Sequence, residues 1–347
     1  IGNAPNLQEL YLSGCTSLVE LPSSIGNLHT LCNLNLRGCS KLEVLPSMAN
    51  LVSVTHLDLN DCSSLKSFPK FFTNIKYLGL TGTSIEEVPS SIMSWSSLEK
   101  LHMPYSENLM EFSCALNNIT HLHLRDTEIQ EISPWVKRCS RLSHFVIKNM
   151  QKLVSVSELP DSLEFLDVEG CESLERLDCS FSNPDVRLNF GKCFKLNQEA
   201  RNLIIQTPAY KHVVLPGGEV PAYFTFRSSG KSVTVKLNEK PPLPTSTKFR
   251  ACIVLATESE FGGAIGLKCR ITSQREDICG SHQFFEGPIF SEHMYLFDVQ
   301  GKDMTSTELE FVFELNTYGS RNNIWIKECG IRQLSELQTK TSETGEC

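Results

Sequence analysis

An apolar triplet with the spacing L-x-x-L-x-L recurs through the first half of the chain and limits the possible folds more than any other feature. Its copies follow one another at steps of 24, 23, 21, 23, 21, 23 and 21 residues. The eight triplets are Leu7/Leu10/Leu12, Leu31/Leu34/Leu36, Val54/Leu57/Leu59, Ile75/Leu78/Leu80, Leu98/Leu101/Met103, Ile119/Leu122/Leu124, Leu142/Phe145/Ile147 and Leu163/Leu166/Val168. A unit of this size cannot bury its apolar face alone, so a phase kept through eight copies predicts units stacked along one axis.

The repeat length and one further position identify the unit. Steps of roughly 20 to 29 residues are typical of leucine-rich repeats, whose motif places Asn or Cys after the apolar triplet. Cys15, Cys39, Cys62 and Cys171 each lie eight positions after the first residue of a triplet. The sequence therefore predicts a leucine-rich-repeat solenoid over residues 1–180, mostly β, with short irregular or helical segments on its convex side.

The chain starts inside a repeat, because Ile1-Gly2-Asn3 recurs as Ile25-Gly26-Asn27. A solenoid needs a capping unit with a polar outer face at each end. We therefore expect this chain to be the C-terminal part of a longer protein, whose N-terminal part holds any motor or catalyst.

Length, charge and hydropathy set further limits. At 347 residues the chain exceeds one core of roughly 100 to 200 residues, so we expect a domain boundary where the repeat stops, at residues 178–184. The net charge of -8 is offset by no basic run, which argues against a general nucleic-acid binder. No stretch of about 18 apolar residues occurs, so we expect no membrane span.

The cysteines indicate a reducing compartment. We interpret those at the shared repeat position as buried free thiols, because a thiol behaves there as a small apolar group with a weak donor. No C-x-x-C pair occurs, which removes the usual zinc and thioredoxin signatures. Free thiols favour the cytosol or nucleus, so we expect a cytoplasmic or nuclear protein.

The sequence lacks common catalytic and cofactor motifs. It contains no G-x-S-x-G and no H-E-x-x-H, and its glycine pairs Gly217-Gly218 and Gly262-Gly263 are not followed by Gly-Lys-Ser/Thr. We expect no enzyme activity, no cofactor and no metal site in this chain.

The predicted strands place a set of polar and aromatic side chains on the concave face. Alternate residues of a strand face opposite sides, and the anchors point inward. The partner-binding candidates on the concave face are Tyr11, Asn35, Arg37, His56, Asp58, Tyr77, Lys100, His102, His121, His123, Arg125, His144, Lys148 and Phe165. Aromatic and arginine side chains carry most interface energy, so we expect a protein partner here. For Phe165, packing against a second domain is an equal alternative.

Histidines are concentrated on this face and allow a second interpretation. His121, His123 and His144 lie on neighbouring predicted strands and could converge in a metal or acid-sensing cluster. Those strands carry no carboxylate partner and show no tight ligand spacing. We therefore favour half-exposed imidazoles on a recognition surface.

The second half of the chain has a different pattern. A helix over residues 197–206, capped by Asn197, is followed by short apolar or alternating runs separated by Gly, Pro and Ser. The predicted strands are 213–215, 223–226, 232–237, 249–256, 266–272, 294–299, 308–315 and 323–327. They predict an all-β sandwich of jelly-roll or immunoglobulin-like type over residues 181–333. The polar residues 334–347 are expected to form a disordered tail.

Residues 274–288 form the longest polar connection between these predicted strands and contain Phe284-Phe285. Long loops on a rigid scaffold commonly bind partners, so we include Phe284 and Phe285 as candidates. The alternative is that one of the two rings belongs to the core.

Several segments after the repeats resemble a known family. They are Leu188-Asn189-Phe190, the run 193–200, Leu215-Pro216-Gly217, the run 220–224 and the run 230–235. They are similar to the post-repeat domain of plant Toll/interleukin-1-receptor-type nucleotide-binding leucine-rich-repeat immune receptors, in particular the downy-mildew resistance receptors of crucifers. Tyr223 departs from the pattern, because the family more often has Trp at this place.

The resemblance implies a function. Receptors of this family bind a pathogen effector, here expected from an oomycete, through the repeat surface and loops of the post-repeat domain. Binding releases the nucleotide-binding module, the receptor assembles as a tetramer, and its N-terminal domains cleave NAD. The partners expected for this chain are therefore an effector and the receptor's own nucleotide-binding and Toll/interleukin-1-receptor domains. The alternative is a carbohydrate- or peptide-binding repeat protein with a lectin-like sandwich.

Overall fold

The chain folds into two compact units, residues 1–207 and residues 208–347. The computed structural model describes residues 3–48, 50–67, 74–85, 95–104, 117–125, 128–132, 134–207, 212–237, 246–258, 263–273, 276–285, 288–302, 306–318 and 324–334. Apart from Leu334, which ends a strand, the expected tail lies outside the described residues.

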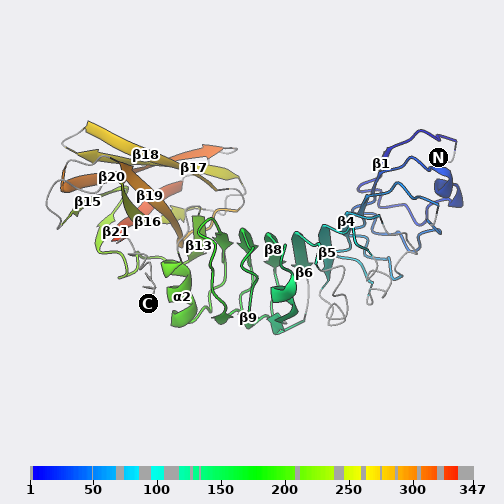
Figure 1. Ribbon diagram of the computed structural model, residues 1–347, viewed down its shortest axis with the longest axis horizontal. Helices are drawn as coiled ribbons and strands as arrows, with labels where there is room; N and C mark the ends of the chain where they lie inside the picture. Colours follow the sequence, from blue (N-terminus) through cyan, green and yellow to red (C-terminus); the bar gives the residue numbers. More distant parts are fainter. Residues whose placement is uncertain are drawn as a thin grey trace, which may run out of the picture. The chain divides into compact units, whose positions relative to one another are not determined.

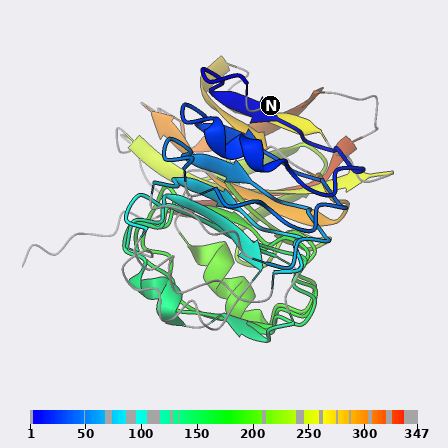
Figure 2. The same ribbon diagram turned by 90° about the vertical axis from the view of Figure 1, so that its right-hand side faces the viewer.

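The first unit is a stack of short parallel strands, as the repeat predicts (Figure 1). In order along the stack they are β1 (Glu9–Tyr11), β2 (Asn33–Asn35), β3 (His56–Asp58), β4 (Tyr77–Gly79), β5 (Lys100–Pro104), β6 (His121–Arg125), β8 (His144–Lys148), β10 (Phe165–Asp167) and β12 (Arg187–Asn189). The pairing keeps equivalent repeat positions side by side, for example Leu101 beside Leu122. Figure 2 looks along the stack and shows successive turns behind one another.

The apolar triplets form the interior of the stack. The middle anchors Leu34, Leu57, Leu78, Leu101 and Leu122 are almost completely buried. Each turn therefore covers the apolar face of its neighbours, and this burial is the main stabilising contribution to the solenoid.

The repeat cysteines bond to the preceding turn. The Sγ atoms of Cys39, Cys62 and Cys171 donate to backbone carbonyls at 3.2, 3.2 and 3.6 Å, and all three cysteines are free and buried. The predicted structural thiols are confirmed at these positions. Cys15, in the first described turn, is free but exposed.

A left-handed residue precedes the cysteine position in most described turns. Gly14, Gly38, Gly82 and Gly170 have φ between 71° and 76° there. Asp61, Asn149 and Lys192 adopt the same conformation at the same position, with φ near 60°. Glycine tolerates this region without steric cost, which explains its recurrence at the point where the chain leaves the strand.

The other side of the solenoid carries short helical and extended segments. They are the 3-10 helices η1 (Ser23–Asn27) and η4 (Pro134–Arg138), and the parallel strands β7 (Glu131–Ile132), β9 (Ser155–Ser157) and β11 (Arg176–Asp178). These segments fit the irregular or helical convex side expected from the sequence.

The first unit extends past the expected boundary at residue 180. Strand β12 pairs in parallel with β10, and Leu188 is fully buried. Cys193 donates to the Val168 carbonyl at 3.1 Å, as the repeat cysteines do. Residues 181–207, expected to belong to the sandwich, therefore continue the solenoid because their apolar positions are covered by the preceding turn.

The expected helix closes this unit. Helix α2 (Gln198–Gln206) begins after Asn197, whose side chain accepts a hydrogen bond from the Ala200 amide at 2.8 Å. This satisfies one of the free amides of the first helical turn, as the N-cap prediction requires.

The second unit consists of two antiparallel sheets. One has the order β13 (His212–Pro216), β19 (His293–Lys302), β16 (Ser246–Thr257), β21 (Ile324–Leu334) and β14 (Phe226–Ser229). The other has the order β15 (Ser232–Lys236), β20 (Glu308–Tyr318), β17 (Ala264–Ser273) and β18 (Glu276–Phe285). Both sheets contribute to one buried cluster that includes Phe249, Ile253, Phe297, Phe311 and Phe313. The predicted sandwich of two sheets is observed (Figure 1).

Two details of the predicted strands are wrong. Residues 276–285, expected to be loop, form the ten-residue strand β18, which pairs with β17 through its backbone at the edge of the sheet. The strand expected at 223–226 starts only at Phe226, after a turn containing Tyr223.

Candidate partner-binding surface

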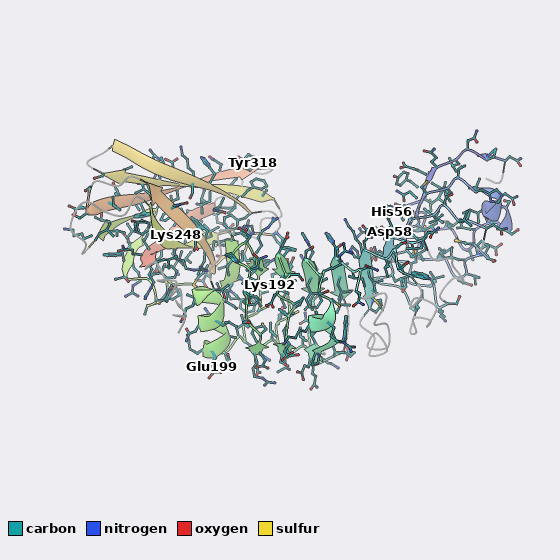
Figure 3. All side chains as sticks on the ribbon, viewed as in Figure 1. His56, Asp58, Lys192, Glu199, Lys248 and Tyr318 are labelled. Atoms are coloured by element: carbon teal, nitrogen blue, oxygen red, sulfur yellow. The ribbon has the colours of Figure 1, made fainter. Side chains whose placement is uncertain are left out.

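The outward-facing residues of the parallel strands form three rows along the solenoid, which we call the concave face. Row A contains the first residue of each strand, row B the third and row C the fifth position of the same turn. The predicted candidates in row A are His56, Tyr77, Lys100, His121, His144 and Phe165; in row B Tyr11, Asn35, Asp58, His102 and His123; in row C Arg37, Arg125 and Lys148. None of these side chains belongs to the buried core. Figure 3 labels His56 and Asp58 on this face.

The histidines in the middle of the face form pairs rather than one cluster. His121 and His144 stack in parallel, with ring centroids 4.2 Å apart. His123 instead meets His102 edge to face at 4.9 Å, and His102 meets Tyr77 at 5.1 Å. The three histidines considered for a metal or acid-sensing cluster therefore divide between two rows.

Hydroxyl groups hold three of the row A histidines. Thr55, Thr120 and Ser143 each place Oγ at 2.9 Å from Nδ1 of the histidine that follows them in sequence. A hydrogen bond to Nδ1 restricts the ring orientation and leaves Nε2 as the outer nitrogen. The sequence carries this signal as a Thr/Ser-His pair at the start of each of these three strands.

Burial keeps the central imidazoles uncharged at neutral pH. It is the largest cause that lowers the pKa of His102, His121 and His123 to about 4. Neighbouring imidazoles and the cations Lys100 and Arg125 lower these pKa values further. The centre of the face therefore presents neutral rings that can donate from one nitrogen and accept at the other.

A buried polar network fixes the N-terminal part of the face. The Asn60 amide donates to Asp58 Oδ1 at 2.7 Å and to the Tyr77 hydroxyl at 3.1 Å, and Asn60 Oδ1 accepts from the Thr81 amide. Burial raises the pKa of Asp58, while bonds from Asn60 oppose that rise. Gly79 lies directly over this network, since an added Cβ would stand 2.4 Å from Asn60 Nδ2. Asn60 thus positions Tyr77, a role that the candidate set missed.

Ion pairs neutralise much of the charge in row C. Arg37 Nε lies 3.3 Å from Asp61, and Lys148 Nζ lies 2.9 Å from Asp167 and 3.0 Å from Glu169. Burial acts most strongly on the pKa of Lys148 and lowers it, but the two carboxylates together outweigh burial and raise that pKa. Lys148 is therefore held in ion pairs with Asp167 and Glu169 within the first unit.

Phe165 is held by its neighbours in row A. Its ring lies 5.7 Å from the His144 ring and 5.9 Å from the Arg187 guanidinium carbon. The half-buried Phe165 ring extends the aromatic surface of His121 and His144 along row A. Tyr11, in row B at the N-terminal end of the concave face, is largely exposed.

The two phenylalanines of β18 point to opposite faces of their sheet. Phe285 is 2% exposed and packs against Tyr295 in the core, so its prediction as a partner-binding residue is wrong. Phe284 is 49% exposed and lies 5.7 Å from the ring of Tyr318, which is 54% exposed. Gly266 lies opposite Phe284 on strand β17 and has no side chain between the two rings. An added Cβ at Gly266 would stand 3.2 Å from the Tyr318 ring. Phe284 therefore remains a candidate, on a sheet surface rather than a loop.

Comparisons with known proteins agree with this architecture. The C-JID domain family matches residues 215–340, and the Leucine Rich Repeat family matches residues 6–28. Probable disease resistance protein RPP1 of Arabidopsis thaliana is 48% identical over 306 residues, covering 85% of this chain and 25% of RPP1. Disease resistance proteins RML1A and RPP5 of the same plant are 34% and 33% identical, over 99% and 96% of this chain.

The chain combines leucine-rich repeats with a C-JID domain. The resemblance to plant disease resistance receptors is thereby confirmed. The chain spans 35% of the length of RML1A and 22% of that of RPP5. Among solved structures, the functional domain of InlJ from Listeria monocytogenes aligns with 74% of this chain and 72% of the InlJ chain, at 12% sequence identity and a TM-score of 0.23.

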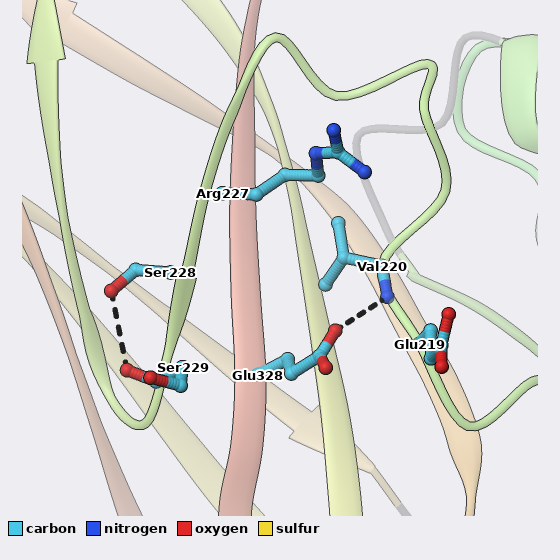
Figure 4. Close-up of a pocket in the computed structure, with 6 residues that line it drawn as sticks. All are labelled: Glu219, Val220, Arg227, Ser228, Ser229 and Glu328. Atoms are coloured by element: carbon cyan, nitrogen blue, oxygen red, sulfur yellow. Dashed lines mark hydrogen bonds between the residues drawn. The ribbon is translucent and has the colours of Figure 1, made fainter.

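The C-JID domain contains a small open pocket of about 370 Å³ (Figure 4). Its lining residues are Glu219, Val220, Arg227, Ser228, Ser229 and Glu328. Glu328 accepts a hydrogen bond from the Val220 amide at 2.9 Å, which ties the 217–222 segment to strand β21. The pocket is polar and shallow, and it was not among the predicted sites.

Within the part of the chain that the structure describes, no group of three or more His, Cys, Asp or Glu side chains could hold a metal ion. Among the same residues, no helix has both the length and the apolar character needed to cross a membrane.

Proposed function

We propose that this chain is the effector-recognition region of a plant immune receptor, with the concave face as its main contact surface. The observation that carries the proposal is the continuous strip of half-buried aromatic and polar side chains from Tyr77 to Phe165. Rigid rings lose little conformational entropy on binding and commonly act as interface hot spots. Exposed Phe284 of the C-JID domain would add a second contact.

The test is direct binding to secreted pathogen proteins, beginning with those of oomycetes. The chain is immobilised, candidate effectors are passed over it, and captured proteins are identified and their affinities measured. The double variant His123→Glu/Arg125→Glu is expected to weaken association about tenfold or more with a melting temperature within a few degrees of the parent. Unchanged affinity would place the contact outside the concave face.

In the full-length receptor, binding would release the nucleotide-binding module and allow assembly of a tetramer in the cytoplasm or nucleus. Cleavage of NAD would belong to its N-terminal domains, and this chain would contribute recognition without a cofactor. This part of the proposal follows the family resemblance.

A second candidate function is carbohydrate binding by the C-JID domain. The exposed Phe284 and Tyr318 rings favour it, because aromatic rings on a sheet surface can stack on sugars. Glycan-array binding that is lost in Tyr318→Ser, without a protein partner, would support this alternative over effector recognition.

A further inference from the structure

Among the residues that the structure describes, one cation in row C of the concave face has no ionic partner. Arg37 is paired with Asp61, and Lys148 is held between two carboxylates. For Arg125, on the strand next to Lys148, no ion pair or hydrogen bond is formed with any residue that the structure describes. The Arg125 guanidinium is half-buried, so its charge is only partly hydrated.

Two buried donor atoms beside this charge also lack partners. Arg125 Nε and His123 Nε2 are both inaccessible to solvent and form no hydrogen bond with the described residues. The two residues are two positions apart on β6, so they point to the same side at a spacing of about 6.6 Å. Buried polar atoms without partners cost free energy, so the hydrogen-bonding capacity of this part of the concave face is incompletely used by the described residues.

The surroundings make this place electrically positive. After burial, the largest causes that lower the pKa of His123 are His102, Arg125 and Lys148, and no carboxylate from the described part of the chain opposes them. Lys100 likewise lowers the pKa of the adjacent His102. In a chain with a net charge of -8, the described residues around His123 thus make the middle of the concave face locally positive.

We propose that Arg125 and His123 bind a carboxylate in an acidic segment of the protein partner. Arg125 would donate from the terminal nitrogens of its guanidinium to both carboxylate oxygens, the fork geometry that Asp and Glu accept, and the neutral His123 ring would line the contact. This inference rests on the proposed function, because it names the chemistry of the partner at the same face. The neutral rings around the pair would exclude water from the contact and strengthen it.

A labelled hexaglutamate peptide is the probe, with hexaglutamine and inorganic phosphate as comparison ligands. Binding is followed by fluorescence anisotropy and by the NMR signals of the His123 ring. Hexaglutamate is expected to bind, to shift the His123 ring signals and to be more weakly bound at high salt, whereas hexaglutamine should not bind. Arg125→Gln is expected to reduce affinity about tenfold or more, the effect of losing a charge-assisted hydrogen bond.

Matched variants distinguish this carboxylate contact from nonspecific electrostatic attraction between hexaglutamate and the chain. Arg176→Gln removes the same charge from strand β11, outside the concave face, and should leave hexaglutamate affinity within about twofold. Arg125→Lys keeps the charge but not the fork of donors, so it should restore only part of the affinity. Equal losses in Arg176→Gln and Arg125→Gln, or binding of phosphate but not hexaglutamate, would overturn the inference. Melting temperatures confirm that each variant is folded.

The effector captured in the binding test distinguishes this inference from the proposed function. If an effector binds the concave face but Arg125→Gln leaves its affinity unchanged, the carboxylate contact is wrong and the proposed function stands. If hexaglutamate binds through Arg125 but secreted pathogen proteins do not bind the chain, the contact stands and the proposed function fails.

Discussion

At the scale of single residues, the concave face depends on histidines that stay neutral. His102 and His123 have folded-state pKa values of about 4, below the ordinary value of 6.5. Between these values the unfolded chain binds more protons than the folded chain, so acid favours unfolding. The stability linked to these rings is fully present above about pH 6.5 and is lost as the pH falls toward 4.

We therefore expect the melting temperature to fall between pH 7.5 and pH 5.0, and to fall less in His102→Asn/His123→Asn. Thermal unfolding followed by circular dichroism at both pH values measures the difference. For a chain of this size, about 1 kcal/mol corresponds to roughly 2 to 4 °C, and the partial exposure of the rings reduces their share. The same pH dependence in parent and variant would show that these rings are not its source.

At the scale of elements, strand β18 separates a core residue from a surface residue. Phe285 packs between the two sheets, whereas Phe284 stands beside Tyr318 on the outer surface. Both facts follow from a strand pairing that the polar composition of residues 274–288 did not reveal.

Phe285→Ser is expected to destabilise the chain by about 3 kcal/mol or more, because it leaves a cavity in the core. Phe284→Ser should change the free energy of unfolding by less than about 1 kcal/mol, while lowering the affinity for any partner that contacts this surface. Urea denaturation of the two variants is the measurement. Comparable losses of stability would mean that both rings are core residues.

At the scale of the whole molecule, the first compact unit ends at Thr207. Strand β12 and helix α2 cover the turn formed by β10, which would otherwise expose its apolar anchors Leu166 and Val168. In repeat proteins each turn is stabilised mainly by its neighbours, so removal of the last turn weakens the one before it.

A fragment of residues 1–207 is therefore expected to melt in one cooperative transition, and a fragment of residues 1–180 at a temperature lower by several degrees. Circular dichroism melting curves compare the two. Identical curves would mean that residues 181–207 contribute nothing to the solenoid.

The repeat pattern itself indicates that the first unit continues past residue 180. Leu188, Phe190 and Cys193 lie 22 positions after Leu166, Val168 and Cys171. The apolar triplet does not predict this ninth turn, because the exposed Asp185 stands where the triplet places its first apolar residue.

The sequence alone determined the solenoid, the inward anchors and the set of side chains on the concave face, because a fixed period imposes the same local geometry on every turn. It also carried the resemblance to plant disease resistance receptors and predicted the helix that closes the first unit. The tertiary structure decided which charged and aromatic groups are engaged: it paired Lys148 with Asp167 and Glu169, and it buried Phe285 while exposing Phe284. Those outcomes depend on contacts with residues from other turns and strands, and no local pattern specifies them.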